Sequence, residues 1–355
     1  MKTEVKRHLL GAILFLSATC LLQGCSRVEP VTNLLKEVNI GYIVYDGRDE
    51  PQPVIIGLDH DSLITQPLGI PMTCPTWSPY YRRLAYSDDG DVYIYDIDRM
   101  TEEIINTDFL ELSAPTWSPN SIYLAFSAQD SPDLGGLDIW LLDLSTHDLE
   151  LVVKCSESSS LTPSCGSPEW LSDGRLGYVR HTGFGSNATP LSNIEIFNPE
   201  SYETEIIATQ LPIYKGWAPF GVTEQFHYAH YSALAWSPDD GRVAFSGGSR
   251  HTGDRNIYVL DVSSKEVSSV LPSETMVDTP IWLDDTHLIF RSITRPDLWE
   301  EGTYTEAYNI AVVNVDNGKV TKLTDFVPIF GAGHNPVISC PFLIPREIGK
   351  QIISS

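Results

Sequence analysis

Basic side chains are scarce in this sequence. Its 355 residues include 23 Lys and Arg against 47 Asp and Glu, which gives a formal net charge of −24 at pH 7. A field of this sign repels phosphate backbones and anionic lipid headgroups. The composition therefore argues against nucleic-acid binding and against electrostatic attachment to a membrane. With 42% hydrophobic and 20% charged residues, the chain is still typical of a folded protein with a sizeable core.

Long apolar runs are also missing, apart from one at the N-terminus. The run from Leu9 to Leu22 follows a basic patch, an order typical of a secretion signal, and is too short to span a membrane comfortably. It ends in LQGC (residues 22–25), which resembles the lipobox of bacterial lipoproteins and implies acylation of Cys25. The alternative is an ordinary signal peptide that is cut nearby. Removing residues 1–24 takes away three basic residues and one acidic one, and leaves a net charge of −26.

Two common enzyme signatures are absent from the sequence. It contains neither the G-x-S-x-G turn of serine hydrolases nor the H-E-x-x-H motif of zinc proteases. The sequence favours a non-catalytic protein over an enzyme, but it does not decide between them.

Cysteine is used sparingly, at six positions. Cys20 leaves with the signal and Cys25 carries the lipid, so four remain in a compartment that permits disulfides. Four cysteines allow three pairings. Cys155 and Cys165 bracket a Ser-rich loop, so we predict that these two form a disulfide.

The chain contains an internal repeat. PTWSP occurs at residues 75–79 and again at 115–119, and related segments place Trp at positions 77, 117, 170, 236 and 282. The Trp spacings of 40, 53, 66 and 46 fit a unit of about 40 residues with insertions. Each unit reads as four short antiparallel strands. We expect Trp77 and Trp117 to wedge between neighbouring sheets, with Ser-Pro starting a turn.

The repeat pattern W-S-P-D-G, aliphatic-A-F-S and I-Y-V-x-D resembles the TolB-type, WD40-like repeat. It is similar to the units of the propellers that precede the catalytic domain in prolyl oligopeptidases. The resemblance covers residues 38–345 and implies an all-β, six-bladed β-propeller of four-stranded antiparallel blades. GYIVYDG (41–47) matches a second strand and HNPVIS (334–339) a first strand. The C-terminal strand is therefore expected to join the N-terminal blade and close the ring.

The expected organisation is a lipoprotein signal peptide (1–24), the lipidated Cys with a linker (25–37), one propeller domain (38–345) and a C-terminal tail (346–355). The hydrolase domain of the prolyl oligopeptidases and the additional N-terminal domain of TolB are not expected here.

The longer insertions all fall on one face of the expected disc, and loops on a rigid scaffold are common binding sites. Arg-His-Thr-Gly occurs twice on this face, and aromatic residues fill its longest loops. An Arg pair would suit a carboxylate or a sugar acid. Alternatively, the motif repeats because blades duplicate, its His residues bond the backbone, and the aromatics pack on their own blades. The candidate ligand-binding residues are Arg180, His181, Arg250, His251, Trp217 and Trp299.

Three further histidines are expected near the mouth of the central channel, and these are His227, His230 and His334. With a carboxylate they would make a transition-metal site. Residues three apart on a strand point to opposite faces, so the site requires residues 227–230 to form a turn. The alternative is that these side chains only hydrogen-bond the backbone, so a divalent metal cofactor is an open possibility.

Two functions follow from the sequence. The first is a non-catalytic, monomeric lipoprotein of the bacterial cell envelope that binds an envelope or periplasmic protein through its long loops. The TolB resemblance implies such a periplasmic interaction module. The second is a metal-assisted enzyme or a binder of acidic sugars at the channel mouth. Structural or sensory roles also remain open.

Overall fold

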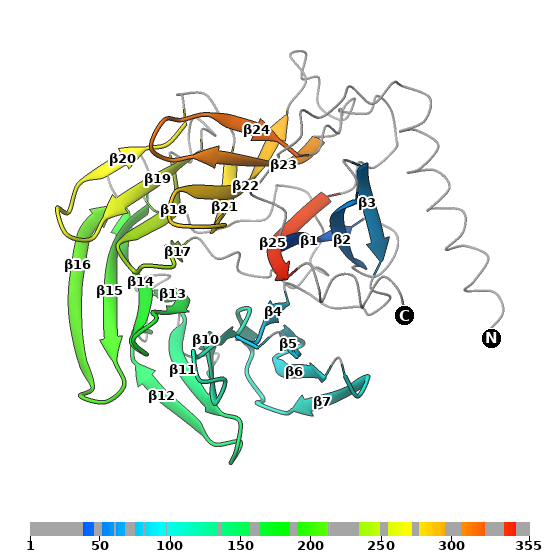
Figure 1. The fold of residues 1–355 in the computed structure, drawn as a ribbon. Helices are drawn as coiled ribbons and strands as arrows, with labels where there is room; N and C mark the ends of the chain where they lie inside the picture. The colour runs from blue at the N-terminus through cyan, green and yellow to red at the C-terminus, as the bar shows by residue number, and fades with distance from the viewer. Residues whose placement is uncertain are drawn as a thin grey trace.

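The computed structural model describes residues 38–45, 52–59, 62–67, 75–80, 82–96, 98–131, 133, 136–156, 164–184, 190–211, 213, 234–248, 255–271, 277–294, 307–323 and 337–345. Within 38–67 and 337–345 it describes the backbone alone. Every regular element that it describes is a β-strand, and the sheets stand around a common axis (Figure 1).

Four neighbouring sheets follow the chain in order, each with four antiparallel strands except the second. The first holds β4 (Thr76–Trp77), β5 (Arg83–Asp88), β6 (Asp91–Asp96) and β7 (Thr101–Ile105). The second holds β8 (Glu111–Leu112), β9 (Thr116–Trp117), β10 (Tyr123–Gln129), β11 (Asp138–Asp143) and β12 (Leu149–Val153). The third holds β13 (Ser164–Trp170), β14 (Leu176–Phe184), β15 (Pro190–Asn198) and β16 (Glu203–Leu211). The fourth holds β17 (Leu234–Trp236), β18 (Arg242–Gly248), β19 (Arg255–Asp261) and β20 (Val267–Ser269).

The last part of the chain builds a sheet from β21 (Val277–Trp282), β22 (His287–Thr294), β23 (Ala307–Asn314) and β24 (Val320–Lys322). The two ends of the described chain meet in one further sheet. It holds β1 (Val38–Tyr45), β2 (Gln52–Asp59), β3 (Ser62–Pro67) and β25 (Val337–Pro345), in the order β25-β1-β2-β3. The expected joining of the C-terminal strand to the N-terminal blade is confirmed by this pairing, which runs from Val38 opposite Pro345 to Tyr45 opposite Val337.

The prediction of six four-stranded blades is wrong. Among the described residues five sheets are four-stranded, and the sheet of β8 to β12 has five strands. Both β8 and β9 pair with the same edge of β10, Leu112 opposite Ala128 and Trp117 opposite Leu124. Between the two pairings the three residues 113–115 stand opposite only two residues of β10, and one of the three is Pro115, which cannot donate to a ladder. The innermost row of this blade is therefore broken into two short strands.

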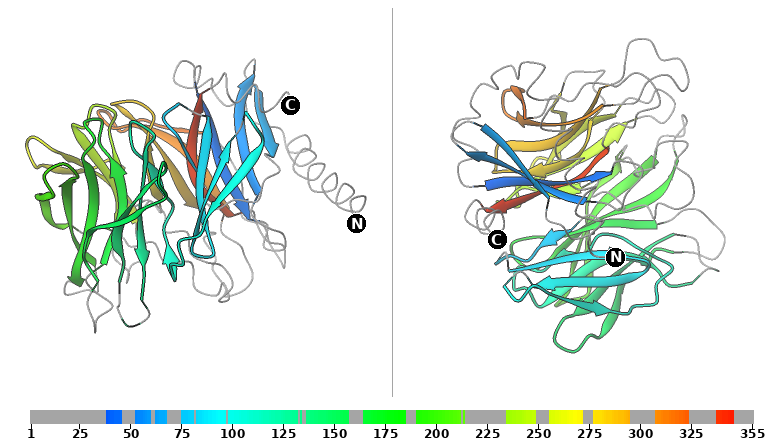
Figure 2. Two further views of the ribbon diagram at one scale, coloured as in Figure 1. Left: turned by 90° about the horizontal axis from the view of Figure 1, so that it is seen from below. Right: turned by 90° about the vertical axis from the view of Figure 1, so that its right-hand side faces the viewer.

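The connections lie on two faces of the disc, because strands in a blade alternate in direction. We call turn face the side that carries the short turns between first and second and between third and fourth strands, for example 78–82 and 98–100. We call loop face the opposite side, which carries the connections between second and third strands and between blades, for example 106–110 and 130–137. Figure 2 shows the blades from the side, with strands running between these faces.

The chain ends leave the propeller on the turn face. β25 contacts β21, β22 and β23 of the preceding blade, as β21 contacts β17, β18 and β19. β25 therefore takes the place of a first strand and runs from the loop face to the turn face. Its last residue, Pro345, lies opposite Val38, the first residue of β1, so both residues lie at the turn face.

Tryptophans of the first strands fill the spaces between blades. Trp117 is 6% exposed and packs among Ala85, Val92 and Ile94 of the preceding blade, so its expected wedging is confirmed. Trp77 packs on Leu84 and the tyrosines of its own blade. The blade that it would face is described without side chains.

Each wedge is also tied by a hydrogen bond to the preceding blade. The indole Nε1 of Trp117 donates to Thr76 O at 3.1 Å, that of Trp170 to Thr116 O at 3.3 Å, and that of Trp282 to Ala235 O at 2.9 Å. In each case the acceptor is the residue just before the preceding Trp. Arg83, at the start of the second strand β5, adds a cation–π contact, since its guanidinium lies 4.8 Å from the Trp117 ring centroid.

The exception is Trp236. Its buried Nε1 has no hydrogen-bond partner among the described residues, although its ring is 6% exposed like that of Trp117. The ring lies against Gly177, where an added Cβ would come within 2.2 Å of Nε1. Glycine is required at this position by the close approach of the ring.

Trp282, whose Nε1 makes the hydrogen bond between blades, and Trp236, whose Nε1 does not, provide a matched test of that bond. We expect Trp282→Phe to lower the free energy of unfolding by about 1–2 kcal/mol more than Trp236→Phe, because only the first leaves a buried carbonyl without its donor. Both changes remove a similar volume from a similar site. Chemical denaturation of the two variants measures the difference, and equal losses would contradict the role of the bond.

Candidate functional site

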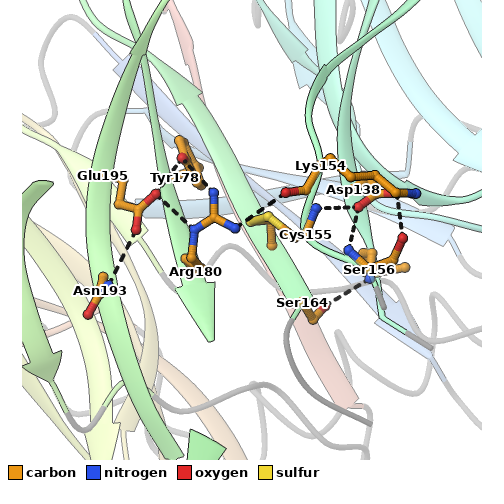
Figure 3. Close-up of a disulfide and its surroundings, with 11 residues drawn as sticks. Asp138, Lys154, Cys155, Ser156, Ser164, Tyr178, Arg180, Asn193 and Glu195 are labelled. Atoms are coloured by element: carbon orange, nitrogen blue, oxygen red, sulfur yellow. Dashed lines mark hydrogen bonds and ion pairs between the residues drawn. A yellow bond between two sulfur atoms is a disulfide. The ribbon is translucent and has the colours of Figure 1, made fainter. Parts of the chain in front are cut away.

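A buried polar cluster lies at the loop-face end of two neighbouring blades, beside a disulfide (Figure 3). Cys155 and Cys165 are joined with a Cα–Cα distance of 5.7 Å, the pairing expected from the sequence. Cys155 follows β12 and Cys165 lies in β13, so the disulfide links the end of one blade to the first strand of the next. Both residues are buried.

Asp138, the first residue of β11, holds the chain where it leaves β12. One carboxylate oxygen accepts the backbone N–H groups of Cys155 and Ser156, both at 2.6 Å. The other accepts from Lys154 Nζ at 2.6 Å and from Ser156 Oγ at 2.7 Å. Burial alone would raise the pKa of Asp138, but the Lys154 ammonium and the donors of Ser156 and Cys155 lower it below its usual value. The carboxylate is therefore charged and fully partnered.

Arg180, a candidate ligand-binding residue, lies on the other side of the disulfide, in β14. Its Nε donates to Glu195 Oε2 at 3.0 Å, one Nη to Tyr178 Oη at 3.3 Å and the other to Lys154 O at 3.4 Å. The Glu195 side chain is 4% exposed. The structure thus directs this guanidinium to an internal carboxylate and to the chain beside the disulfide.

The Tyr178 hydroxyl donates to the same Glu195 oxygen at 2.5 Å. Burial, and then this bond to Glu195, raise the pKa of Tyr178 to about 12. The second Glu195 oxygen accepts from Asn193 Nδ2 at 3.3 Å. Glu195 therefore links three side chains on adjacent strands and completes the polar cluster.

His181, the second candidate of this motif, is buried at 8% exposure. Its Nδ1 lies 2.7 Å from Oγ of Ser192, the residue of β15 that stands opposite His181 in the sheet. The structure places Arg180 and His181 in a network of contacts within their own blade and with the preceding blade.

Sequence reasoning missed Asp138, Glu195 and a third carboxylate, Glu169. For Asp138 a signal was present, since each third strand from β6 onward carries Asp or Asn within its first four residues, at 91, 138, 193, 256 and 309. Asp91 accepts from Thr107 N at 2.9 Å and Asn256 donates to Leu271 O at 3.2 Å. In these three blades the Asp or Asn therefore binds the chain as it leaves the fourth strand, at the base of the loop-face connection.

Glu169 stands where two blades meet, one residue before Trp170. A bulge shifts the register of β13 between Gly166 and Glu169, and Ser167 there has a φ of 51°. The Oε2 atom of the Glu169 carboxyl group accepts the backbone N–H of Trp236 at 2.9 Å. Burial, and to a smaller extent the charge of Asp240, raise the pKa of Glu169 to about 8 against the opposing effect of that bond.

The other candidate residues lie outside the described residues. These are the lipidation site Cys25, the ligand candidates Arg250, His251, Trp217 and Trp299, and the metal candidates His227, His230 and His334. Within the described ranges, no group of three or more His, Cys, Asp or Glu is placed to hold a metal ion. In the same ranges, no helix has the length and apolar character to cross a membrane.

Loss of the disulfide should loosen this region measurably. It closes a loop of 10 residues, so we expect a Cys155→Ala/Cys165→Ala variant to lose about 2–3 kcal/mol of unfolding free energy. Chemical denaturation gives the value, with the wild-type protein in reductant as a second measurement. A double variant as stable as the oxidised protein would contradict this structural role.

The ring of sheets, the Trp wedges and the joined chain ends define a β-propeller, and its fold is similar to that of TolB-type propellers. Solved structures with a similar fold include TolB from Acinetobacter baumannii, with a TM-score of 0.58 and 16% identity over 88% of this chain and 67% of that one. A putative TolB from Agrobacterium tumefaciens has a TM-score of 0.51 and 16% identity over 87% and 98%. An oligogalacturonate lyase from Vibrio parahaemolyticus has a TM-score of 0.51 and 12% identity over 80% and 74%.

At these identities the similarity concerns the fold alone. No protein-family model matches the sequence, and no curated protein matches it.

Proposed function

We propose that this protein is a lipid-anchored, extracytoplasmic propeller that binds a protein or another envelope component through its loop face. The observation that carries the proposal is the position of the chain ends. Val38 lies at the turn face, so a lipid anchor at Cys25 would connect the membrane to the turn face, which is opposite the loop face. The loop face is then left free for a partner.

The anchoring of the loop bases supports the same function. Asp138, the disulfide and Arg180 hold the connection after β12 to two blades at once. A surface that is rigid at its base loses less conformational entropy when a partner binds. The TolB-type fold is consistent with a periplasmic interaction module.

The test places a photo-crosslinking amino acid at exposed positions of either face in cells that make the full-length protein. Leu110 and Lys154 represent the loop face, and Lys319 represents the turn face. We expect one discrete crosslinked partner from the first two positions and none from the third. Crosslinks from Lys319 alone would overturn the assignment of the binding face.

The anchor has its own test. Cys25→Ser is expected to move the protein from the membrane to the soluble fraction, together with loss of acyl mass from the N-terminal peptide. A variant that stays in the membrane fraction would show that Cys25 is not the anchor.

A second candidate is a metal-assisted enzyme or a binder of acidic sugars at the channel mouth, using His227, His230 and His334. The fold is shared with an oligogalacturonate lyase, which is compatible with this candidate. Elemental analysis of the protein beside a His227→Ala/His230→Ala variant tests it. Stoichiometric zinc, manganese or iron that is lost in the variant would support it, and a metal-free protein would count against it.

A further inference from the structure

We propose that the turn face of the blade formed by β4 to β7 is a membrane-contact surface that rests on the phospholipid headgroups. The surface consists of Tyr80, Arg82, Arg99 and Met100 and is called here the turn-face patch. The inference rests on the proposed anchor at Cys25 and adds to it which side of the propeller meets the bilayer, and through which residues.

The patch holds the two most exposed large apolar side chains of the described chain. Tyr80 is 70% exposed and Met100 is 68% exposed. Tyr80 lies in the turn between β4 and β5, and Met100 lies in the turn between β6 and β7. Both turns lie on the turn face of the same blade, so this face presents an exposed aromatic and an exposed thioether side chain.

The two turns are held together by charged side chains. Arg82 Nη1 donates to both oxygens of Asp98 at 2.7 and 3.0 Å, which ties the first turn to the second. Arg99 Nη1 lies 3.6 Å from Asp96 Oδ2, with its side chain 80% exposed. The patch therefore combines an aromatic ring, a flexible thioether and two arginines whose stems can lie along an apolar surface.

These residue types suit the boundary between lipid and water. Tyr concentrates at membrane interfaces because its ring is apolar and its hydroxyl is polar. Arginine can reach phosphate oxygens while its stem stays in the apolar layer. Met100 supplies apolar area that would be buried among the headgroups and acyl chains.

Charge decides the kind of surface that the patch can approach. The whole chain carries −24, which opposes an anionic membrane. In the patch, Arg82 and Arg99 face Asp98 and Asp96, so the local charges balance. The expected occupant is therefore a phospholipid surface met at a locally neutral part of an acidic protein.

The position of the anchor brings this patch to the membrane. Val38 lies at the turn face, in the blade next to β4 to β7 (Figure 1). Residues 25–37 separate Cys25 from Val38, and 13 residues reach at most about 45 Å in any conformation. The tether thus keeps the turn face near the bilayer, whereas the loop face is directed away from it.

The experiment compares two exposed apolar residues on opposite faces. An azide-bearing amino acid replaces Met100 in one variant and Leu110 in the other, and each is coupled to an environment-sensitive dye. Leu110 is 56% exposed and lies in the loop-face connection between β7 and β8, so it is a matched control. The full-length acylated protein is reconstituted in phosphatidylcholine and phosphatidylethanolamine vesicles that contain a lipid with a spin label near the headgroup.

We expect lipid quenching of the dye at position 100 to exceed that at position 110 by about twofold or more. Tyr80→Ser in the Met100-labelled protein should reduce that quenching without changing flotation of the vesicles with bound protein. Equal quenching at the two positions, or stronger quenching at 110, would overturn the membrane-contact surface while the protein still floats. Protein that does not float would overturn the anchor at Cys25, and the surface with it.

Discussion

Asp138→Ala is expected to lower the free energy of unfolding by about 3–5 kcal/mol, one of the two largest effects that we predict for this protein. The side chain is 2% exposed, and it accepts from two backbone N–H groups, a lysine and a serine hydroxyl. Alanine would leave the N–H groups of Cys155 and Ser156 buried without acceptors. Lys154 is 47% exposed and can turn to water, so the loss comes mainly from the backbone.

Chemical denaturation with matched controls separates these contributions. Lys154→Ala removes the ammonium alone and should cost about 1 kcal/mol or less. Asp148→Ala removes an exposed carboxylate of the same blade and should cost still less. If Asp138→Ala proved no more costly than Lys154→Ala, the backbone contacts would not matter and the assigned role of Asp138 would be wrong.

The second large effect is a pH dependence of the free energy of unfolding, which is caused by titration of Glu169. The pKa of this carboxyl is about 8 in the folded protein against 4.5 for the ordinary side chain. The folded state therefore holds a proton that the unfolded state releases between these values. The stabilisation is fully present below pH 4.5 and is lost as the pH rises to about 8, a change of up to about 5 kcal/mol.

Glu169→Gln tests this directly. The amide oxygen can still accept the Trp236 N–H, and the group no longer titrates. We expect the free energy of unfolding of the variant to be nearly flat from pH 5 to pH 8 relative to the wild type, when both are measured by urea denaturation. Parallel curves for the two proteins would show that Glu169 does not titrate in this window.

A substitution at Asp240 tests separately what raises the pKa of Glu169. Its charge adds to the burial effect on Glu169, and it accepts from Ser172 N and Oγ across the joint between the two blades. Asp240→Asn should shift the midpoint of the pH dependence toward lower pH and leave a slope. An unchanged midpoint would assign the whole shift to burial.

Much of the propeller could be predicted from the Trp repeat. A strand that carries a large aromatic every 40 to 66 residues must bury it against a neighbour, which requires sheets set side by side. The pairing of β25 with β1 followed from the incomplete repeats at the two ends. The number of strands in the blade of β8 to β12 did not follow, because the repeat does not show that three residues, 113–115, stand opposite two residues of β10.

The candidate site was harder to predict, because sequence spacing does not show which residues a side chain at the end of a strand will bond. Arg180 and His181 belong to a repeated motif, which indicated a shared ligand. The register of β14 on β15 instead sets Tyr178 opposite Glu195 and His181 opposite Ser192. Their partners are supplied by a neighbouring strand, so the motif alone could not reveal them.

By itself, then, the sequence determined the class of fold, the meeting of the chain ends and the Cys155–Cys165 pairing, because these depend on repeated patterns and short separations. Only the tertiary structure decided that Glu169 accepts from Trp236, 67 residues away, and that Tyr80 and Met100 are left exposed on the turn face. Burial and solvent exposure depend on which blades pack together. That packing sets the pKa of Glu169, and it leaves the turn-face patch open to solvent on the side from which the chain ends leave.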